Sequence, residues 1–229
     1  MGAAFRAILI GGTGQVGGAV LQALLATPDC REIVHITRKP LSAAHASQVR
    51  PVVMDTGADD FEAHIAALTR DTRALGDRVV AISCVGVGSG TAKWSETRLR
   101  QVEVGVVGAF ARGVRAAGVE HFGLLSAAGA TSRSRLKYVR VMGLKEEAVQ
   151  AVGFPRLAIF RPGIIEGNAH TPAWIAWLGR LIPDPWGNIA QRDIGRAFAA
   201  AMVRNAASSG AEVYGNRSMR GLAAAWRVG

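Results

Sequence analysis

The chain alternates between short apolar runs and longer stretches with the periodicity of amphipathic helices. Apolar runs typical of buried strands lie at residues 5–10, 32–36, 51–54, 78–84, 120–126 and 156–160. Helices are expected between or after them, at residues 19–26, 59–69, 96–117, 137–152 and 192–204. Strands that alternate with helices predict an α/β fold, with a parallel sheet and right-handed crossovers that place helices on both faces.

The composition agrees with an ordered α/β protein. Of 229 residues, 49% are hydrophobic and 28 are glycine, which suits a compact chain with one buried core. We expect residues 1–229 to form a single domain. Residues 163–188 interrupt the alternation and are predicted to form a small lid over the substrate side of the sheet. The lid's Trp174, Trp177 and Trp186 fit either an apolar substrate pocket or packing within the lid.

The charge and the cysteines limit the class of protein. The net charge is +10, but the arginines are scattered, which favours attraction of an anionic cofactor over binding of nucleic acid. Cys30 and Cys84 form no disulfide framework, the first apolar run has no basic leader, and no stretch is long enough to span a membrane. We therefore expect a cytoplasmic protein without membrane contact. A homo-oligomer is compatible with the sequence.

The most informative motif follows the first apolar run. Residues 11–18 read Gly-Gly-Thr-Gly-Gln-Val-Gly-Gly and lie between a predicted strand and a predicted helix. The early glycines allow a tight turn, the middle glycine lets the backbone approach a diphosphate, and Gly17 lets the helix pack close to the strand. The alternative is a plain strand–helix turn. We expect cofactor contacts from Gly11, Thr13, Gly14, Gln15 and Val16.

The end of the second predicted strand indicates which cofactor binds. NAD-binding chains usually carry an acidic residue there, whereas this chain has Thr37 followed by Arg38 and Lys39. A carboxylate would repel the 2′-phosphate of NADP, and a guanidinium forms paired hydrogen bonds with it. The sequence therefore predicts NADPH over NADH. The alternative is that both cations belong to a solvated loop.

Other strand ends provide further candidate contacts with the cofactor. Asp55 follows the third predicted strand, where an acid can either bond the adenine amino group or cap the next helix. Val85 and Gly86 follow the fourth strand at its carboxyl end, where ligands of open α/β sheets lie. Pro162 follows the sixth strand, where the backbone can line the nicotinamide or simply form a turn.

With these motifs in order, the chain resembles the short-chain dehydrogenase/reductase superfamily. More narrowly, it is similar to the atypical NAD(P)-binding group that includes the Tat-interacting-protein-type oxidoreductases. The resemblance is carried by residues 10–17, 121–130, 138–143, 160–163 and 192–197. It implies a single doubly wound parallel Rossmann sheet. It also implies that Tyr138 contacts the cofactor and exchanges a proton with a carbonyl substrate, while Ser126 orients the substrate oxygen.

The sequence departs from this superfamily at residue 142. The superfamily has a lysine four residues after the tyrosine, where it holds the nicotinamide ribose and lowers the tyrosine pKa; this chain has Met142. Because methionine has no charge, we expect Tyr138 to stay protonated at neutral pH and to serve reduction better than alcohol oxidation. Lys145 either leans back toward the site or lies on the surface, paired with nearby acids.

Two functions follow from these residues. The first is an NADPH-dependent reductase of a small carbonyl compound, favoured by Tyr138 and Ser126. The second is a catalytically weak NADP(H)-binding sensor or regulator that engages another protein, favoured by Met142. No metal is expected, because neither His121 nor His170 has partners at ligand spacing.

Overall fold

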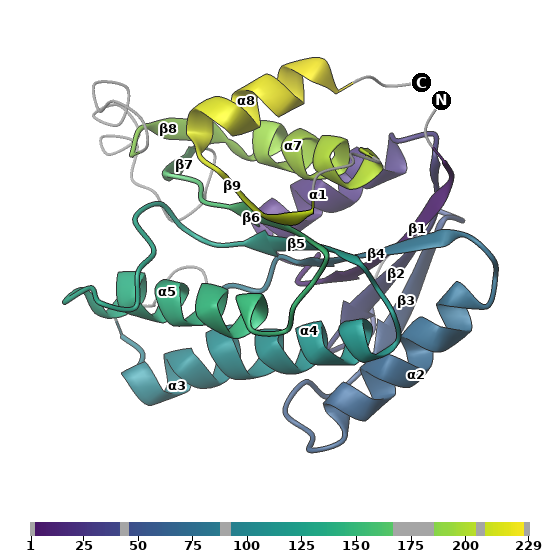
Figure 1. The fold of residues 1–229 in the computed structure, drawn as a ribbon, viewed down its shortest axis with the longest axis horizontal. Coiled ribbons are helices and arrows are strands. Elements are labelled where there is room, and N and C mark those ends of the chain that lie inside the picture. Colours follow the sequence, from purple (N-terminus) through teal and green to yellow (C-terminus); the bar gives the residue numbers. More distant parts are fainter. Residues whose placement is uncertain (1–2, 42–45, 88–92, 167–185, 205–208, 227–229) are drawn as a thin grey trace.

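Seven parallel strands form the central sheet of the computed structural model (Figure 1). The structure describes residues 3–41, 46–87, 93–166, 186–204 and 209–226. The strands are β1 (Phe5–Ile10), β2 (Cys30–Thr37), β3 (Val49–Val53), β4 (Arg78–Ser83), β5 (His121–Leu125), β6 (Arg156–Phe160) and β9 (Gly210–Tyr214). Their order in the sheet is β3-β2-β1-β4-β5-β6-β9, which is the doubly wound Rossmann order with one added edge strand. The predicted fold class is confirmed.

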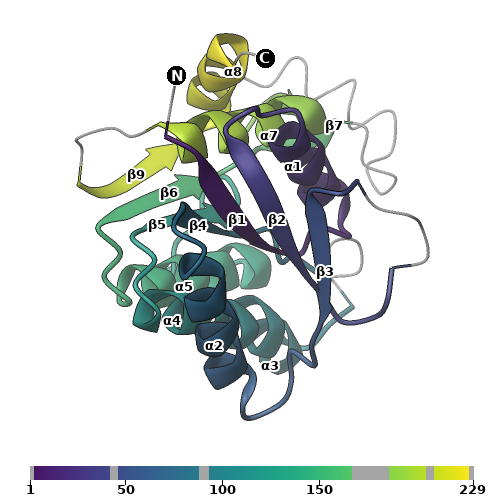
Figure 2. The same ribbon diagram turned by 90° about the vertical axis from the view of Figure 1, so that its right-hand side faces the viewer.

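Helices cover both faces of the sheet (Figures 1 and 2). One face carries α1 (Gln15–Leu25), α7 (Gln191–Val203) and α8 (Asn216–Ala225). The other carries α2 (Phe61–Arg73), α3 (Glu96–Arg100), the π-helix η1 (Gln101–Val106), α4 (Val107–Ala116) and α5 (Lys137–Gln150). A separate two-stranded sheet pairs β7 (Ile164–Glu166) with β8 (Asn188–Ala190).

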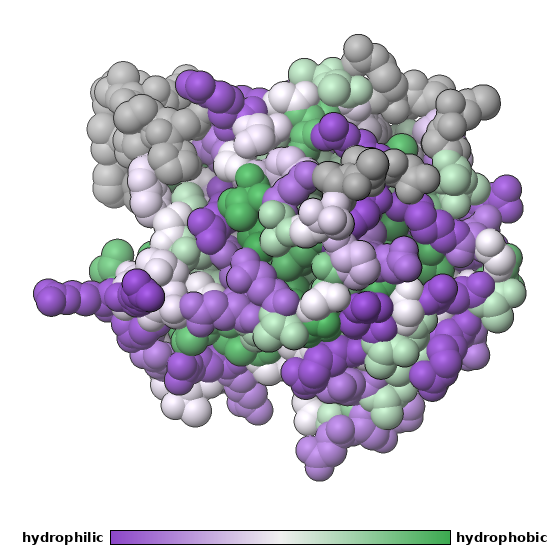
Figure 3. Space-filling view, viewed as in Figure 1, coloured by the Kyte–Doolittle hydropathy of each residue, from purple (hydrophilic) through white to green (hydrophobic). Residues whose placement is uncertain are grey.

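Burial on both faces explains the apolar runs of the sequence. Successive side chains of a strand point to opposite faces, so Leu9 packs in the core under α1 and α7, and Ile8 packs in the core under α2 and α4. Phe160 of β6 stacks on Phe198 of α7 with ring centroids 3.7 Å apart. The space-filling view shows hydrophobic residues at the centre of one face, between these two helical layers (Figure 3).

Several elements differ from the sequence prediction. β9 and α8 were not predicted, because β9 is a largely exposed edge strand that lacks a continuous apolar run. The long helix predicted at residues 96–117 is interrupted by η1. Of the predicted lid, residues 163–166, which include β7, and residues 186–188 are described, whereas Trp174 and Trp177 lie outside the described residues. None of the helices described here is long and apolar enough to cross a membrane.

Candidate functional site

The glycine-rich turn joins β1 to α1 through close backbone contacts. Gly11 has a φ of +84°, and a Cβ there would lie 2.5 Å from the carbonyl carbon of Cys84. A Cβ on Gly17 would lie 2.0 Å from the carbonyl oxygen of Gly11. Gly14 has more room, since its nearest such contact is at 3.4 Å. The turn is thus closed toward β4 and α1, and it leaves the backbone near Gly14 accessible to a ligand.

A cavity of about 450 Å³ lies beside this turn, at the carboxyl ends of β1, β2 and β4. This is where the strand order reverses and where ligands of doubly wound sheets bind. Of the predicted cofactor residues, the cavity is lined by Gly11, Thr13, Gly14, Arg38, Val85 and Gly86. The structure therefore brings together residues that lie up to 75 positions apart in the chain, from Gly11 to Gly86.

Residues in and just before α3 and in η1, which the sequence did not single out, also line this cavity. They include Trp94 and Arg98, whose guanidinium lies 4.2 Å from the indole ring. Val102 and Val106 contribute from η1. No strand end or glycine motif marks these positions in the sequence, because only the packing of α3 and η1 brings them to the sheet.

The other predicted cofactor residues are not among those that line the described cavity. Asp55 Oδ1 accepts a hydrogen bond from the backbone N–H of Gly57 at 2.9 Å, as in a turn that precedes a helix. The carbonyl of Pro162 accepts a hydrogen bond from the N–H of Ala128 at 2.9 Å. Both observations show local structural roles, and cofactor contacts of these two residues stay predictions.

Three further predicted cofactor residues are Gln15 and Val16, in the first turn of α1, and Lys39, in the loop after β2. Gln15 Oε1 accepts a hydrogen bond from Gln191 Nε2 at 3.2 Å, and Val16 packs against the core under α1. The carbonyl of Lys39 accepts a hydrogen bond from Thr37 Oγ1 at 2.9 Å, while the Lys39 residue itself is exposed. Gln15 and Lys39 lie next to cavity residues in the chain and Val16 lies two positions from Gly14, and the contacts of all three with a cofactor also stay predictions.

Tyr138 lies in the first turn of α5 and keeps 39% of its surface exposed. Burial of the phenol and the nearby Glu103 carboxylate raise the pKa of Tyr138 well above its usual value. The hydroxyl is therefore protonated at neutral pH. This direction agrees with the expectation drawn from the missing lysine; burial is its main cause, and the Glu103 carboxylate, which the sequence did not indicate, adds to it.

Lys145 lies in the interior, two turns beyond Tyr138 on α5. Its Nζ donates to Glu103 Oε2 at 2.9 Å and to the carbonyl of Val85 at 3.4 Å. The two side chains of this ion pair are only 2% and 1% exposed. Of the two alternatives for Lys145, the surface position is wrong, because η1 and α5 enclose both charges, although the pairing with an acid is observed.

Met142, at the position of the missing lysine, is 1% exposed and packs in a small apolar cluster with Leu99, Val141 and Ala130. The residue thus fills space between α3, α5 and the loop after β5.

Ser126 is buried at the end of β5, and its hydroxyl donates to Glu146 Oε1. Arg161 holds the same carboxylate with two hydrogen bonds, at 2.9 Å to Oε1 and 2.5 Å to Oε2. These bonds raise the pKa of Arg161. The hydroxyl hydrogen of Ser126 is therefore directed at Glu146, which leaves its lone pairs to accept a hydrogen bond.

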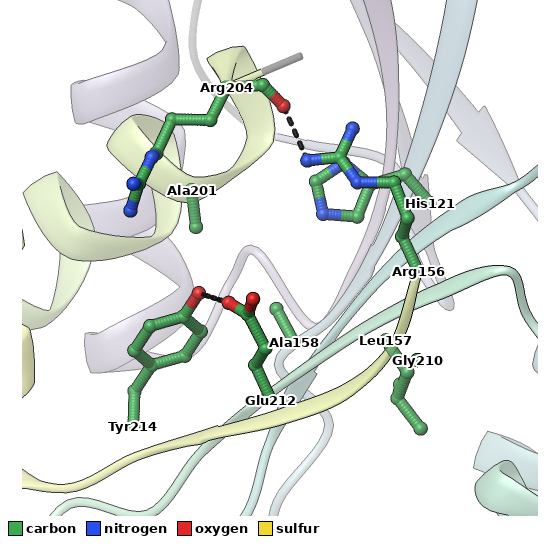
Figure 4. A pocket seen from close by; sticks show the side chains of 9 residues that line it. All are labelled: His121, Arg156, Leu157, Ala158, Ala201, Arg204, Gly210, Glu212 and Tyr214. Atoms are coloured by element: carbon green, nitrogen blue, oxygen red, sulfur yellow. Dashed lines mark hydrogen bonds between the residues drawn. The ribbon is translucent and has the colours of Figure 1, made fainter. Parts of the chain in front are cut away.

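A second, smaller cavity of about 40 Å³ lies toward the amino ends of β5, β6 and β9 (Figure 4). Arg156 donates to the carbonyl of Arg204 at 2.5 Å, and Arg78 donates to that of Met202 at 2.9 Å. These arginines satisfy carbonyls at the end of α7, where cations are favourable. His121 lies beside them, and burial together with Arg156 and Arg78 lowers its pKa to about 3. We assign this cavity a structural role.

Comparisons with known proteins identify relatives of this chain by sequence. No model of a known protein family matches it. The protein named fmp52, mitochondrial, of Aspergillus clavatus is 34% identical over 162 residues, which cover 70% of this chain and 66% of that protein. A protein of the same name from Coccidioides immitis is 26% identical over 94% of this chain and 92% of its own length. The alignment to the Aspergillus relative thus spans just under two thirds of that relative's length.

The names of these relatives contradict the cytoplasmic location expected from the sequence, since they are called mitochondrial. The expectation was wrong because it depended on unpaired cysteines and on the lack of an apolar span. Both properties are shared by proteins of other reducing compartments, so they do not distinguish between them.

Solved structures show the fold. UDP-glucuronic acid 4-epimerase of Bacillus cereus, in complex with UDP-glucuronic acid and NAD, has a TM-score of 0.67 at 13% identity and covers 92% of this chain and 77% of its own. The oxidoreductase ylbE of Lactococcus lactis has a TM-score of 0.67 at 14% identity over 97% of this chain and 98% of its own. The chain thus shares the Rossmann fold of these enzymes and is similar in sequence to the Fmp52 proteins.

Proposed function

We propose that the protein is an NAD(P)H-dependent oxidoreductase that reduces a carbonyl group of a small molecule, with NADPH as the preferred cofactor. The observation that supports this most is the cavity at the carboxyl ends of β1, β2 and β4. It has the glycine turn on one side and Arg38 on another, and none of its described lining residues is acidic. We expect neither nucleic acid nor membrane as a partner.

The glycine turn and Arg38 fit the phosphate groups of a dinucleotide cofactor. A Cβ on Gly17 would overlap the turn, so the short glycine keeps α1 close enough to direct its N-terminal N–H groups at a diphosphate. Arg38, which lines the cavity just after β2, would hold the 2′-phosphate. When bound, NADPH supplies the hydride for the reduction.

The proton comes from the chain. Tyr138 is protonated at neutral pH and gives its hydroxyl proton to the carbonyl oxygen as the alcohol forms. Ser126 donates its hydrogen to Glu146, so in this arrangement it does not donate to the carbonyl oxygen and accepts a hydrogen bond only from the alcohol that forms. The Glu146–Arg161 pair keeps that hydroxyl in one orientation.

The substrate is expected to approach from the side of the predicted lid. Gly129, in the loop after β5, has a φ of +73°, and a Cβ there would lie 2.1 Å from Trp186. Trp186, at the edge of the predicted lid, therefore covers the loop that follows Ser126. A half-exposed indole at this place favours a substrate with an apolar part.

A cofactor titration followed by a screen of aldehydes and ketones tests the proposal. NADPH should bind, at least one carbonyl compound should be reduced, and Tyr138→Phe should abolish turnover without a change in cofactor affinity. Tyr214→Phe is the matched control, since Tyr214 belongs to β9 and lines the second cavity. Turnover that survives Tyr138→Phe would refute the assignment of the proton donor.

The second function, a cofactor-binding sensor or regulator, is favoured by the apolar surroundings of Met142. In that case NADPH would bind with the same preference, but no carbonyl compound would be reduced. The titration and the screen together distinguish the two functions.

A further inference from the structure

Trp94 and Arg98 line the cofactor cavity, the cavity of about 450 Å³ beside the glycine turn, but the function proposed above gives them no role. The Arg98 guanidinium lies 4.2 Å from the centre of the Trp94 ring. Arg98 belongs to α3, and Trp94 precedes that helix by two positions. A ligand in this cavity therefore meets these two stacked side chains as well as the glycine turn.

The charge of Arg98 is not neutralised within the part of the chain that the structure describes. Its guanidinium forms no hydrogen bond or ion pair there, and its one contact of this kind is the aromatic ring. Glu96 of the same helix pairs with Arg140 at 2.6 Å. Glu103, in η1, pairs with Lys145 at 2.9 Å. The acids closest to Arg98 in sequence are thus bound to other cations, and its donors are available to an anion.

Arg38 lines the same cavity from the loop after β2. Among the described residues that line it, none is acidic. Two cations without an acid at one cavity create a positive potential, which attracts a polyanion. The volume lies within the range of about 300–1,000 Å³ that is typical of small-molecule sites, so Arg38 and Arg98 face a single ligand.

The indole of Trp94 fixes how Arg98 presents its donors. A guanidinium that lies over an aromatic face keeps its N–H groups in its own plane, where they can form paired hydrogen bonds with a phosphate. Trp94 is anchored, because its carbonyl accepts a hydrogen bond from Lys137 Nζ at 2.6 Å. Ser95 Oγ accepts from the backbone N–H of Arg98 at 3.2 Å and caps α3. Arg98 is thus held in advance and loses less freedom when it binds an anion.

Arg100 shows what an arginine of the same helix does outside the cavity. Its side chain is 52% exposed and pairs with Glu96 at 3.9 Å, and it is not among the described residues that line the cavity. Arg98 is exposed as well, but it lines the cavity and has a ring rather than an acid as its neighbour. Because the two arginines carry the same charge two positions apart, Arg100 is a matched control for Arg98.

We propose that Arg98, held in place by Trp94, is a second phosphate-binding arginine of this cavity and binds phosphate groups of the cofactor from α3. This inference rests on the proposed function for the identity of the ligand. NADPH carries a diphosphate and a 2′-phosphate, and paired hydrogen bonds from a guanidinium recognise either group. Separate probes for the two groups decide which of them Arg98 binds.

Isothermal titration with NADPH and with three fragments tests the proposal. The fragments are 2′-AMP, which has no diphosphate, 5′-ADP, which has no 2′-phosphate, and adenosine, which has neither. Arg98→Gln should weaken NADPH binding about 10- to 100-fold, as expected for the loss of a charge-assisted hydrogen bond. It should weaken at least one of the two phosphorylated fragments as well, and the affinity for adenosine should not change.

Arg100→Gln removes the same charge from α3 and should leave all of these affinities unchanged. Since Arg98 and Arg100 are both exposed, neither replacement should disturb the core, and circular dichroism checks that the variants stay folded. Unchanged binding of NADPH and of both phosphorylated fragments by Arg98→Gln would overturn the proposal. An equal loss of affinity in Arg100→Gln would also overturn it, because long-range charge rather than contact would then explain the effect.

Substitution of Trp94 tests whether this residue positions Arg98. Trp94→Leu changes no charge, but it should weaken NADPH binding about two- to fivefold, which corresponds to an exposed cation–π contact. Trp94→Phe keeps an aromatic face and should have a smaller effect. In the Arg98→Gln background Trp94→Leu should cause no further loss, because a positioning residue acts through the residue that it positions. A full additional loss would overturn the positioning role of Trp94.

The same titrations distinguish a failure of the Arg98 assignment from a failure of the proposed function. If the parent protein binds neither NADPH nor the fragments, both fail together. If the parent binds NADPH and Arg98→Gln binds it equally well, the Arg98 assignment fails and the proposed function stands. If Arg98→Gln loses affinity as expected but the parent reduces no carbonyl compound, the Arg98 assignment holds and the reductase function fails.

Discussion

A Cβ atom on Gly17 would lie 2.0 Å from the carbonyl oxygen of Gly11, far inside the contact distance of the two atoms. This relationship fixes how closely α1 approaches the turn after β1. Gly14, the N-cap of α1, lines the cavity where we place the cofactor diphosphate.

Gly17→Ala should consequently abolish measurable NADPH binding and lower the thermal midpoint of unfolding, because either the turn or the helix must move. Gly18→Ala is the matched control. A Cβ at Gly18 would meet only the carbonyl oxygen of Gly12, at 3.7 Å, so the Gly18→Ala variant should bind cofactor normally. Isothermal titration of both variants checks this, and unchanged binding by Gly17→Ala would contradict our placement of the diphosphate.

Arg38→Glu should remove most of the preference for NADPH over NADH. A charge-assisted hydrogen bond to a 2′-phosphate contributes roughly 1.5–3 kcal/mol, or about one to two decades in affinity. Arg70→Glu makes the same charge change on the exposed surface of α2 and should leave the ratio of the two dissociation constants unchanged. Equal dissociation constants in the unaltered protein would show that the cofactor assignment is wrong.

Met142→Lys should restore the superfamily's lysine in sequence but destabilise this chain. Met142 is 1% exposed among apolar side chains, and an unpaired buried charge typically costs about 3–5 kcal/mol. Met142→Leu, which conserves volume, should cost less than about 1.5 kcal/mol. Urea unfolding measures both. Similar stabilities for the two variants would mean that a lysine at this position reaches solvent or a partner.

Stability should fall with acid through His121. Its pKa is about 3 in the folded chain against 6.5 for an ordinary histidine, so between these values the unfolded chain binds a proton that the folded chain does not. The free energy of unfolding should therefore decrease below pH 6.5, by up to about 1.4 kcal/mol per pH unit.

Unfolding of His121→Gln and of the parent can be compared between about pH 7.5 and about pH 4.5, the range in which an ordinary histidine titrates. The variant should have a shallower pH dependence, since glutamine does not titrate. His64→Gln is the control, because the His64 side chain is 63% exposed on α2. Identical slopes for His121→Gln and the parent would exclude His121 as the group responsible.

Local patterns in the sequence determined most strands of the sheet and the glycine turn beside the cavity where we place the cofactor. Buried parallel strands must be apolar on both faces, so β1 and β6 were predicted with their observed bounds. The glycine turn was also recognisable from the sequence, because its close contacts involve residues near each other in the chain, such as Gly11 and Gly17.

Only the tertiary structure decided what surrounds Tyr138. The sequence showed that a lysine was missing at Met142, but not that Lys145 is enclosed or that Glu103 is its partner. That contact spans 42 positions and depends on a π-helical turn that the periodicity of the sequence did not predict. Likewise, the hydrogen bond from Ser126 to Glu146 joins a strand end to a helix 20 positions away. The sequence carries each of these polar residues, but their protonation and orientation depend on neighbours that meet only when helices pack on the sheet.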